Sequence, residues 1–266
     1  MVTSLRTAGN AAISAGLRSA LLWGCLLMAV PPSLAAPKKE NMVTPRLPQN
    51  ARILFQGDSI TDGGRWHSDD PNHIFGQSYA YLIAAQCGGH YPDKGWTFIN
   101  RGISGNKVTD LAARWQADTI AEQPTVLSVL VGVNDTNAVM DGREESGAAI
   151  TEYEATYDRL LEEAQAKLPN VQFVLCEPFI LKLGRTQDRY ERWTEEIKLR
   201  QAVVEKLAKK YHAPVVHFQK VFDDACKRAP ADYWIWDGIH PTYAGHQLMA
   251  DEWLRTINAF YEAKSR

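Results

Sequence analysis

This sequence lacks the short motifs that mark several large classes of enzyme. It has no Gly-x-Ser-x-Gly segment, which disfavours the α/β-hydrolase fold. It has neither a Walker A motif nor a Gly-x-Gly-x-x-Gly motif, so nucleotide binding has no support. The His-Glu-x-x-His motif of zinc proteases is absent as well. Any catalytic chemistry must therefore come from another arrangement of side chains.

Cysteine is scarce, and like charges do not cluster. Of the four cysteines in 266 residues, only Cys87, Cys176 and Cys226 lie beyond residue 36, so at most one pair can form there. A scaffold held together by disulfides is therefore disfavoured. Cys176 sits in an apolar run, which favours a small buried hydrophobe over a reactive thiol. The formal net charge is −2 without runs of one sign, which gives no support for nucleic-acid binding.

The amino-terminal segment combines positive charge with a short apolar run. Two arginines precede the apolar residues 20–30, and small residues at 33–36 offer a cleavage site. Because the run is too short to span a bilayer and is followed by Pro31, we predict a secretory signal peptide over residues 1–36. Cys25 lies inside the apolar run rather than at its end, which disfavours a lipoprotein signal. We expect export to the periplasm or the cell exterior, with no stable membrane insertion after cleavage.

Beyond residue 50, apolar runs of strand length alternate with segments of helical periodicity. This alternation predicts right-handed crossovers and a parallel sheet between two layers of helices, that is, a three-layer α/β/α sandwich. We expect one domain over residues 51–266, preceded by a largely unstructured leader over residues 37–50. The expected strands are 52–56, 96–100, 126–131, 171–176 and 214–218. The expected helices are 77–87, 107–122, 146–168, 189–211 and 242–263.

The first expected strand ends abruptly in Gly57, Asp58 and Ser59. Such a turn places the serine at the carboxyl end of a buried strand, where open α/β sheets bind ligands. Gly-Asp-Ser alone is a weak signal, because these are ordinary turn residues. A serine hydroxyl becomes a good nucleophile when a base takes its proton and donors stabilise the oxyanion that follows. The rest of the chain must therefore supply a histidine, a group that orients it, and hydrogen-bond donors.

Three other segments supply these groups. Asp237 precedes His240 by three residues, so its carboxylate can hold the imidazole in one tautomer while the other ring nitrogen faces Ser59. Gly105 and Asn134 each follow a different expected strand. Because the carboxyl ends of parallel strands lie at one edge of a sheet, we expect Ser59, Gly105 and Asn134 to meet there.

With the segments around Ser59, Gly105, Asn134 and His240 in this order, the chain resembles an SGNH hydrolase of the GDSL esterase/lipase superfamily. The resemblance runs from Arg52 to about Gly245 and implies a five-stranded sheet in the flavodoxin-like order 2-1-3-4-5. The matching blocks are Gly57-Asp58-Ser59, Gly105 within residues 101–106, Gly132-Val133-Asn134-Asp135, and Asp237-Gly238-Ile239-His240.

The resemblance also implies the role of each site residue. Ser59 would be the nucleophile, His240 the base and Asp237 the group that orients the base. The oxyanion would be held by the backbone N–H groups of Ser59 and Gly105 and by the side-chain amide of Asn134. The function implied is hydrolysis of a carboxylic ester through an acyl-enzyme on Ser59.

Each of these residues also has an ordinary structural explanation. Asn134 begins an Asn-x-Thr acceptor sequence and can cap a helix, but a glycan would block the sheet edge. Gly105 can serve a left-handed turn, which is compatible with a backbone donor aimed at an oxyanion. Asp58 adjoins the serine, yet we expect it to hydrogen-bond the turn. We expect Asp135 to be structural.

One loop holds several residues that can bind metal ions. His67, Asp69, Asp70 and His73 lie close together, but their spacing matches no established zinc pattern. Loops rich in aspartate are usually just solvated. We therefore expect no metal site and no cofactor.

Aromatic residues lie near the expected site in the sequence. Trp66, Phe179, Trp234 and Trp236 occur on loops predicted at the same sheet edge, where their rings can stack on a sugar or line an acyl pocket. They can equally pack the histidine loop against the core. No long insertion remains to form an apolar lid, which favours an open cleft and a short acyl group.

The segment 101–106 is most similar to that of bacterial GDSL enzymes that deacetylate carbohydrates. We therefore predict an exported esterase that removes O-acetyl groups from plant or other polysaccharides or oligosaccharides. The enzymatic alternative is a broad lysophospholipase, thioesterase or arylesterase. A non-catalytic carbohydrate-binding protein is disfavoured, because every catalytic position holds a suitable residue. The sequence gives no indication of the oligomeric state.

Overall fold

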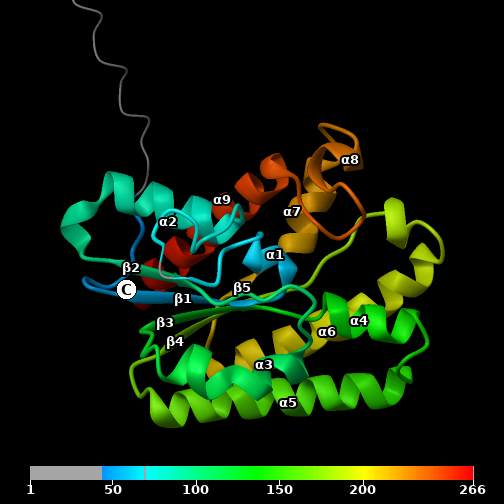
Figure 1. Ribbon diagram of the computed structural model, residues 1–266, viewed down its shortest axis with the longest axis horizontal. Coiled ribbons are helices and arrows are strands. Elements are labelled where there is room, and N and C mark those ends of the chain that lie inside the picture. Colours follow the sequence, from blue (N-terminus) through cyan, green and yellow to red (C-terminus); the bar gives the residue numbers. More distant parts are fainter. Residues whose placement is uncertain (1–43, 69, 266) are drawn as a thin grey trace, which may run out of the picture. The chain divides into compact units, whose positions relative to one another are not determined.

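Five parallel strands form the sheet at the centre of the computed structural model, which describes residues 44–68 and 70–265 (Figure 1). The strands lie in the order β2-β1-β3-β4-β5. This confirms the α/β class and the strand order implied by the family resemblance. The strands are β1 (Arg52–Gly57), β2 (Thr97–Asn100), β3 (Val126–Leu130), β4 (Gln172–Cys176) and β5 (Val215–Val216).

Strand β1 lies between β2 and β3 and is buried on both of its faces. Leu54 pairs with Ile99 of β2 on one side and with Leu127 of β3 on the other. Because successive side chains of a strand point to opposite faces, Phe55 belongs to one apolar cluster and Leu54 to the other. A continuous apolar run is what a central parallel strand covered by two helix layers requires.

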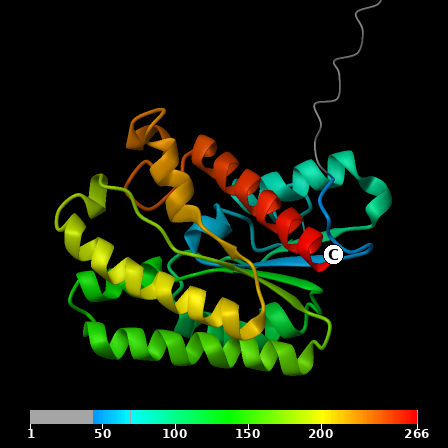
Figure 2. The ribbon, with the colours of Figure 1, turned by 180° about the vertical axis from the view of Figure 1, so that it is seen from behind.

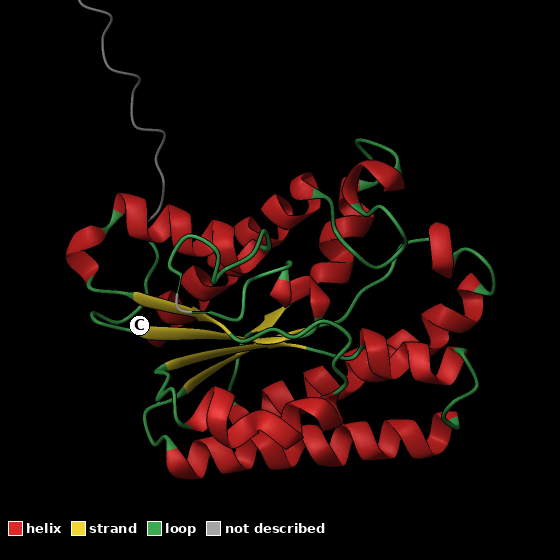
Figure 3. Cartoon of the chain, viewed as in Figure 1, coloured by secondary structure: helices red, strands yellow, loops and turns green. Residues whose placement is uncertain are grey.

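Helices cover the sheet in two layers, as Figures 1 and 3 show. The layer that contacts the Phe55 face includes α2 (Tyr79–His90), α7 (Phe218–Ala225), α8 (Ala231–Trp234) and α9 (Tyr243–Lys264). The other layer includes α3 (Val108–Trp115), α5 (Ser146–Lys167) and α6 (Tyr190–Tyr211), with α4 (Val133–Met140) packed against α5 and α6. From behind, α5 and α6 lie side by side along one face of the sheet (Figure 2).

Several short helical segments were not visible in the sequence pattern. The expected helix 107–122 is instead α3 followed by a π-helical segment, Gln116–Ile120, which ends where Ala121 N–H donates to the carbonyl of Gln116. Helices α4 and α7 have eight residues each, too few for a clear helical period. The remaining short helices are α1 (Ser59–Asp62), Pro92–Lys94 and Gly184–Thr186.

The described part of the leader, residues 44–50, has no helix or strand but packs against the domain. Leu47 is buried in the core, and the backbone N–H of Arg46 donates to Asn258 Oδ1 at 2.7 Å. These contacts hold residues 44–50 against the domain although the stretch lacks regular secondary structure. Residues 1–43, with the predicted signal peptide, lie outside the described residues. Within the described residues, no helix combines the length and apolar character needed to cross a bilayer.

The three described cysteines are free thiols. Cys176 and Cys87 are buried, and burial raises the pKa of each thiol to about 12. The prediction that Cys176 is a buried hydrophobe is confirmed.

His246 links α9 to the start of α2 as a buried, uncharged side chain. Its Nδ1 accepts a hydrogen bond from the backbone N–H of Tyr79 at 3.2 Å. Burial is the larger cause and the charge of His240 the smaller one, and together they lower the pKa of His246 to about 4. The folded protein therefore keeps this ring neutral at pH values where an exposed histidine is protonated.

We expect the free energy of unfolding to fall as the pH drops from 6.5 to 4, because the unfolded chain binds a proton that folded His246 excludes. The loss begins near the unfolded pKa and is complete near the folded pKa, and it amounts to about 3 kcal/mol. His246→Asn keeps an acceptor for Tyr79 but does not titrate. Urea unfolding at pH 7 and pH 4 should show a smaller pH effect in this variant; equal pH effects would contradict the assignment.

Candidate active site

Three side chains form a continuous hydrogen-bonded chain beyond the carboxyl edge of the sheet. Ser59 Oγ lies 2.8 Å from His240 Nε2, and His240 Nδ1 lies 2.8 Å from Asp237 Oδ2. These are the distances expected between a serine, a base and a carboxylate that orients the base. The structure thus brings the three predicted residues together in the predicted order.

Ser59 is the first residue of α1, directly after β1 and its terminal Gly57. A Cβ atom at Gly57 would lie 2.4 Å from the carbonyl oxygen of Leu130 and 2.4 Å from Thr61 Oγ1, so only glycine fits this close approach. Asp58 caps α1 by accepting a hydrogen bond from the N–H of Ile60 at 3.0 Å. As predicted, Asp58 hydrogen-bonds the turn. Burial raises its pKa to about 7, although the bond from Ile60 and the charge of His240 lower it.

Asp237 is held by donors from its own loop. Its Oδ1 accepts from the backbone N–H groups of Ile239 at 3.0 Å and His240 at 2.8 Å, while its Oδ2 faces His240 Nδ1 and, at 3.3 Å, an N–H of Arg185. Burial alone would raise the pKa of Asp237, but the hydrogen bonds from His240 and Ile239 lower it to about 2. The carboxylate is therefore ionised at neutral pH and favours the imidazole tautomer with the proton on Nδ1.

Gly105 and Asn134 follow the two strands that flank β1. Gly105 has a φ of +85°, and a Cβ atom there would meet nothing, so its backbone conformation rather than lack of space favours glycine. Asn134 is the second residue of α4, and its Nδ2 donates to the carbonyl of Asn106 at 3.1 Å. Gly105 thus lies on the loop after β2 and Asn134 in the first turn of α4 after β3, so the two residues flank the serine turn, where hydrogen-bond donors for an oxyanion are needed.

Asp62 was not recognised from the sequence, although it joins the serine turn to the loop after β2. Its Oδ2 accepts from the backbone N–H of Ser104 at 3.0 Å and from Ser104 Oγ at 2.6 Å. Its Oδ1 accepts from the N–H of Arg65 at 3.1 Å. The sequence did contain a signal for this role, because Asp62 lies three residues after Ser59 and therefore on the same turn of chain. Asp62 thereby fixes the loop that carries Gly105.

Arg114 of α3 supports the same loops from the neighbouring layer. Its guanidinium donates to the carbonyl of Gly57 at 3.2 Å, to the carbonyl of Arg101 at 2.7 Å and to Asn106 Oδ1 at 2.8 Å. One side chain thus connects the ends of β1 and β2 with the residue that follows Gly105. No local motif marks this role of Arg114, because its partner at the end of β1 lies 57 residues away in the sequence. Asp135, expected to be structural, accepts from the N–H of Val108 at 3.2 Å, the first residue of α3.

Residues 55–248 match the GDSL-like Lipase/Acylhydrolase family. The chain belongs to this family. It is 32% identical over 216 residues to an acetylxylan esterase of Geobacillus stearothermophilus, an alignment that covers 77% of this chain and 93% of the relative.

Two solved structures are similar to this GDSL family member. One, named as a GDSL-like lipase of Parabacteroides merdae ATCC 43184, has a TM-score of 0.74 and 39% identity, with 82% of this chain and 99% of that chain covered. The other is a catalytic mutant of Axe2, an acetylxylan esterase of Geobacillus stearothermophilus, with a TM-score of 0.70 and 30% identity over 79% of this chain and 95% of that one. The chain is a carboxylic ester hydrolase.

The four aromatic residues predicted near the site of this GDSL hydrolase fall into two groups. Trp236 is 65% exposed, and its ring stacks on that of His240 with centroids 6.1 Å apart and an angle of 27°. Trp66 is also exposed and stacks on His73. Both rings are therefore accessible to a ligand.

Phe179 and Trp234 were wrongly assigned to substrate binding. Phe179 is fully buried and packs against Phe218 and Phe222. Trp234 is buried as well, with its indole N–H donating to the carbonyl of Ala229. For these two residues, packing into the core is the correct explanation.

The loop rich in histidine and aspartate is held by a local pair. His73 Nδ1 lies 2.5 Å from Asp70 Oδ2, while Asp69 is outside the described residues. His67 and Asp70 are not brought into a metal-ligating group with His73.

The carboxylates of Asp237 and Asp58 should respond differently to substitution. Asp237→Asn should lower kcat for ester hydrolysis about 10⁴-fold, because the amide favours the wrong imidazole tautomer. Asp58→Asn keeps the oxygen that caps α1 and should retain activity within about tenfold. Initial rates on nitrophenyl acetate check this, with circular dichroism to confirm folding. Equal losses in the two folded variants would refute the assignment of Asp237.

Proposed function

We propose that this GDSL ester hydrolase is an exported carbohydrate O-acetylesterase. The observation that carries the proposal is the exposed ring of Trp236, which lies over His240 and offers a flat apolar face beside the reacting groups. Sugar rings present apolar C–H faces to such aromatic surfaces. The similarity to an acetylxylan esterase supports a short acyl group on a carbohydrate. Export rests on the predicted signal peptide.

The proposed reaction has two steps through an acyl-enzyme. His240 takes the proton of Ser59 as its oxygen attacks the acetyl carbonyl, and then gives that proton to the leaving sugar oxygen. Water, activated by His240, next attacks the acetyl-serine, releasing acetate and restoring Ser59. Asp237 stays ionised throughout and stabilises the imidazolium that forms in each step.

Both tetrahedral intermediates carry a negative charge on the former carbonyl oxygen. We assign the backbone N–H groups of Ser59 and Gly105 and the Asn134 amide as its donors, because they border the serine on the strand ends beside β1. Asn134 Nδ2 carries two hydrogens. In this assignment one of them binds the oxyanion while the other keeps its bond to the carbonyl of Asn106.

Asn134→Ala should lower kcat about 10²- to 10³-fold with a much smaller change in KM, because the donor acts on the oxyanion rather than on the bound ester. Asn137→Ala is the matched control: Asn137 lies on the same helix, and its amide donates to a surface partner, Asp141. Steady-state kinetics on nitrophenyl acetate separate kcat from KM. Full activity in a folded Asn134→Ala variant would remove this residue from the mechanism.

The acyl group can be identified by rates on nitrophenyl esters of two, four, eight and twelve carbons, with Ser59→Ala as the control. We expect a steep fall beyond two carbons, together with release of acetate from acetylated xylan. The structure named as a GDSL-like lipase, which is 39% identical, favours one alternative, a lipid or thioester hydrolase. A maximum at eight or more carbons, without acetate release from xylan, would support that alternative and overturn the acetylesterase proposal.

A further inference from the structure

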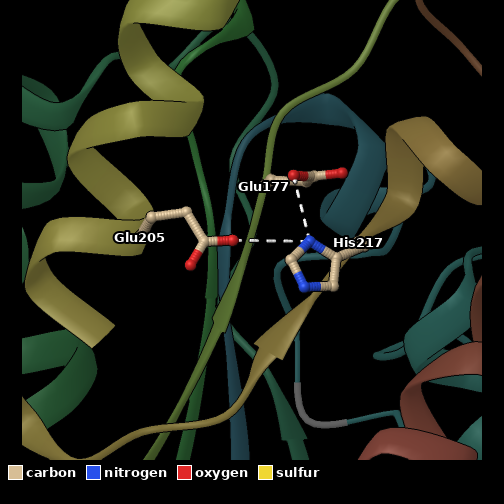
Figure 4. A group of neighbouring side chains, drawn as sticks. All are labelled: Glu177, Glu205 and His217. Carbon is tan, nitrogen blue, oxygen red and sulfur yellow. Dashed lines mark hydrogen bonds and ion pairs between the residues drawn. The ribbon is translucent and has the colours of Figure 1, made fainter. Parts of the chain in front are cut away.

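A second group of titratable side chains lies near the carboxyl ends of β4 and β5 (Figure 4). Glu177 directly follows β4, His217 directly follows β5, and Glu205 lies on α6. One ligand atom from each lies within 4.8 Å of the other two. We propose that these three residues bind a divalent transition-metal ion, for which Zn²⁺ is the best match.

Both carboxylates point at the same nitrogen of the imidazole, as the dashed lines in Figure 4 show. His217 Nδ1 lies 3.4 Å from Glu177 Oε2 and 3.5 Å from Glu205 Oε1. That nitrogen carries at most one proton, so it cannot donate good hydrogen bonds to both oxygens. Both separations also exceed the usual N–H···O range of about 2.7–3.2 Å. A hydrogen bond alone therefore does not account for the convergence.

The two nitrogen-to-oxygen separations suit ligands of one metal ion, and the third pair of ligand atoms, the two carboxylate oxygens, lies within 4.8 Å. Zn²⁺ binds imidazole nitrogen and carboxylate oxygen at about 2.0–2.2 Å, and tetrahedral angles then place neighbouring ligand atoms about 3.3–3.5 Å apart. The Nδ1 to oxygen distances of 3.4 and 3.5 Å fall in this range. A cation between the three atoms would also replace the repulsion between two carboxylates with attraction to both.

Glu177 is positioned by backbone contacts that leave its Oε2 facing His217. Glu177 N–H donates to the carbonyl of Val216 at 3.1 Å, and Glu177 Oε1 accepts from the N–H of Gln219 at 3.0 Å, so that Oε2 is the oxygen that faces His217. Such contacts with the outer atoms of a ligand fix its orientation toward a metal. Glu205 projects from the interior of a helix of 22 residues, a rigid support.

The donor set selects the class of ion. One imidazole and two carboxylates suit Zn²⁺ and related transition metals, whereas Mg²⁺ and Ca²⁺ prefer ligands that are all oxygen. His217 and Glu205 are partly exposed and Glu177 is nearly buried, so the ion would sit at the surface with its remaining position open to water. Because it would join α6 to the ends of β4 and β5, we expect it to stabilise the fold, independently of the ester reaction.

The test is isothermal titration calorimetry of the protein without an affinity tag, after dialysis against EDTA, with Zn²⁺ and separately with Mg²⁺. We expect one Zn²⁺ per chain and no comparable binding of Mg²⁺. His217→Gln and Glu205→Gln should each weaken Zn²⁺ binding at least tenfold; Glu205 is partly exposed and glutamine has nearly its shape, so Glu205→Gln should fold. His73→Gln is the matched control, because it removes another histidine paired with a carboxylate.

Thermal unfolding supplies a second readout. Zn²⁺ should raise the Tm of the wild type and of His73→Gln, but not that of His217→Gln. Absence of Zn²⁺ binding by the wild type would overturn the proposal. So would Zn²⁺ binding that persists unchanged in both His217→Gln and Glu205→Gln, or that is lost in His73→Gln. Esterase rates do not enter the test, so its result stands apart from the acetylesterase proposal.

Discussion

The parallel pairing of β1 with β2 and β3 is the constraint on which the reactive site depends. Ser59, Gly105 and Asn134 are far apart in the sequence and share an edge only because each follows the carboxyl end of one of these strands. Parallel strands require long crossovers, so no local interaction can bring the three together. The close approach of Gly57 to the carbonyl of Leu130 shows how tightly the serine turn is packed against β3. A side chain there would displace the serine from its neighbours.

His240 is placed at this edge differently, because its loop lies between two helices, α8 and α9, and not directly after a strand of the sheet. Asp237 organises that loop and the imidazole with one carboxylate: Oδ1 binds the backbone N–H groups of Ile239 and His240, and Oδ2 faces Nδ1 of the ring. The residues that shape the loop are therefore the same ones that set the direction of the ring. Because the donors stabilise the charged form, the carboxylate stays ionised despite its burial.

Sequence reasoning succeeded where a local pattern determines the structure. Apolar runs gave the strands, and the blocks around Ser59 and His240 gave the hydrogen-bonded chain, because strand ends and short loops position such residues directly. It failed where tertiary contacts decide. Phe179 follows a strand at the correct edge, yet its ring turns into the core between helices, which no neighbouring residue indicates. Arg114 has partners on β1 and on the loop after β2, so its role becomes visible only in the folded chain.

The same sheet edge carries two histidines with opposite electrostatic arrangements. In the reactive site, His240 faces Asp237 through one ring nitrogen and Ser59 through the other, so a single proton on Nδ1 satisfies the carboxylate. At the ends of β4 and β5, two carboxylates face the one Nδ1 of His217, and one proton cannot satisfy both. Protonating the ring still leaves one N–H for two acceptors, whereas a metal ion binds all three atoms at once. The number of acceptors per nitrogen thus distinguishes a group suited to proton transfer from one suited to binding a cation.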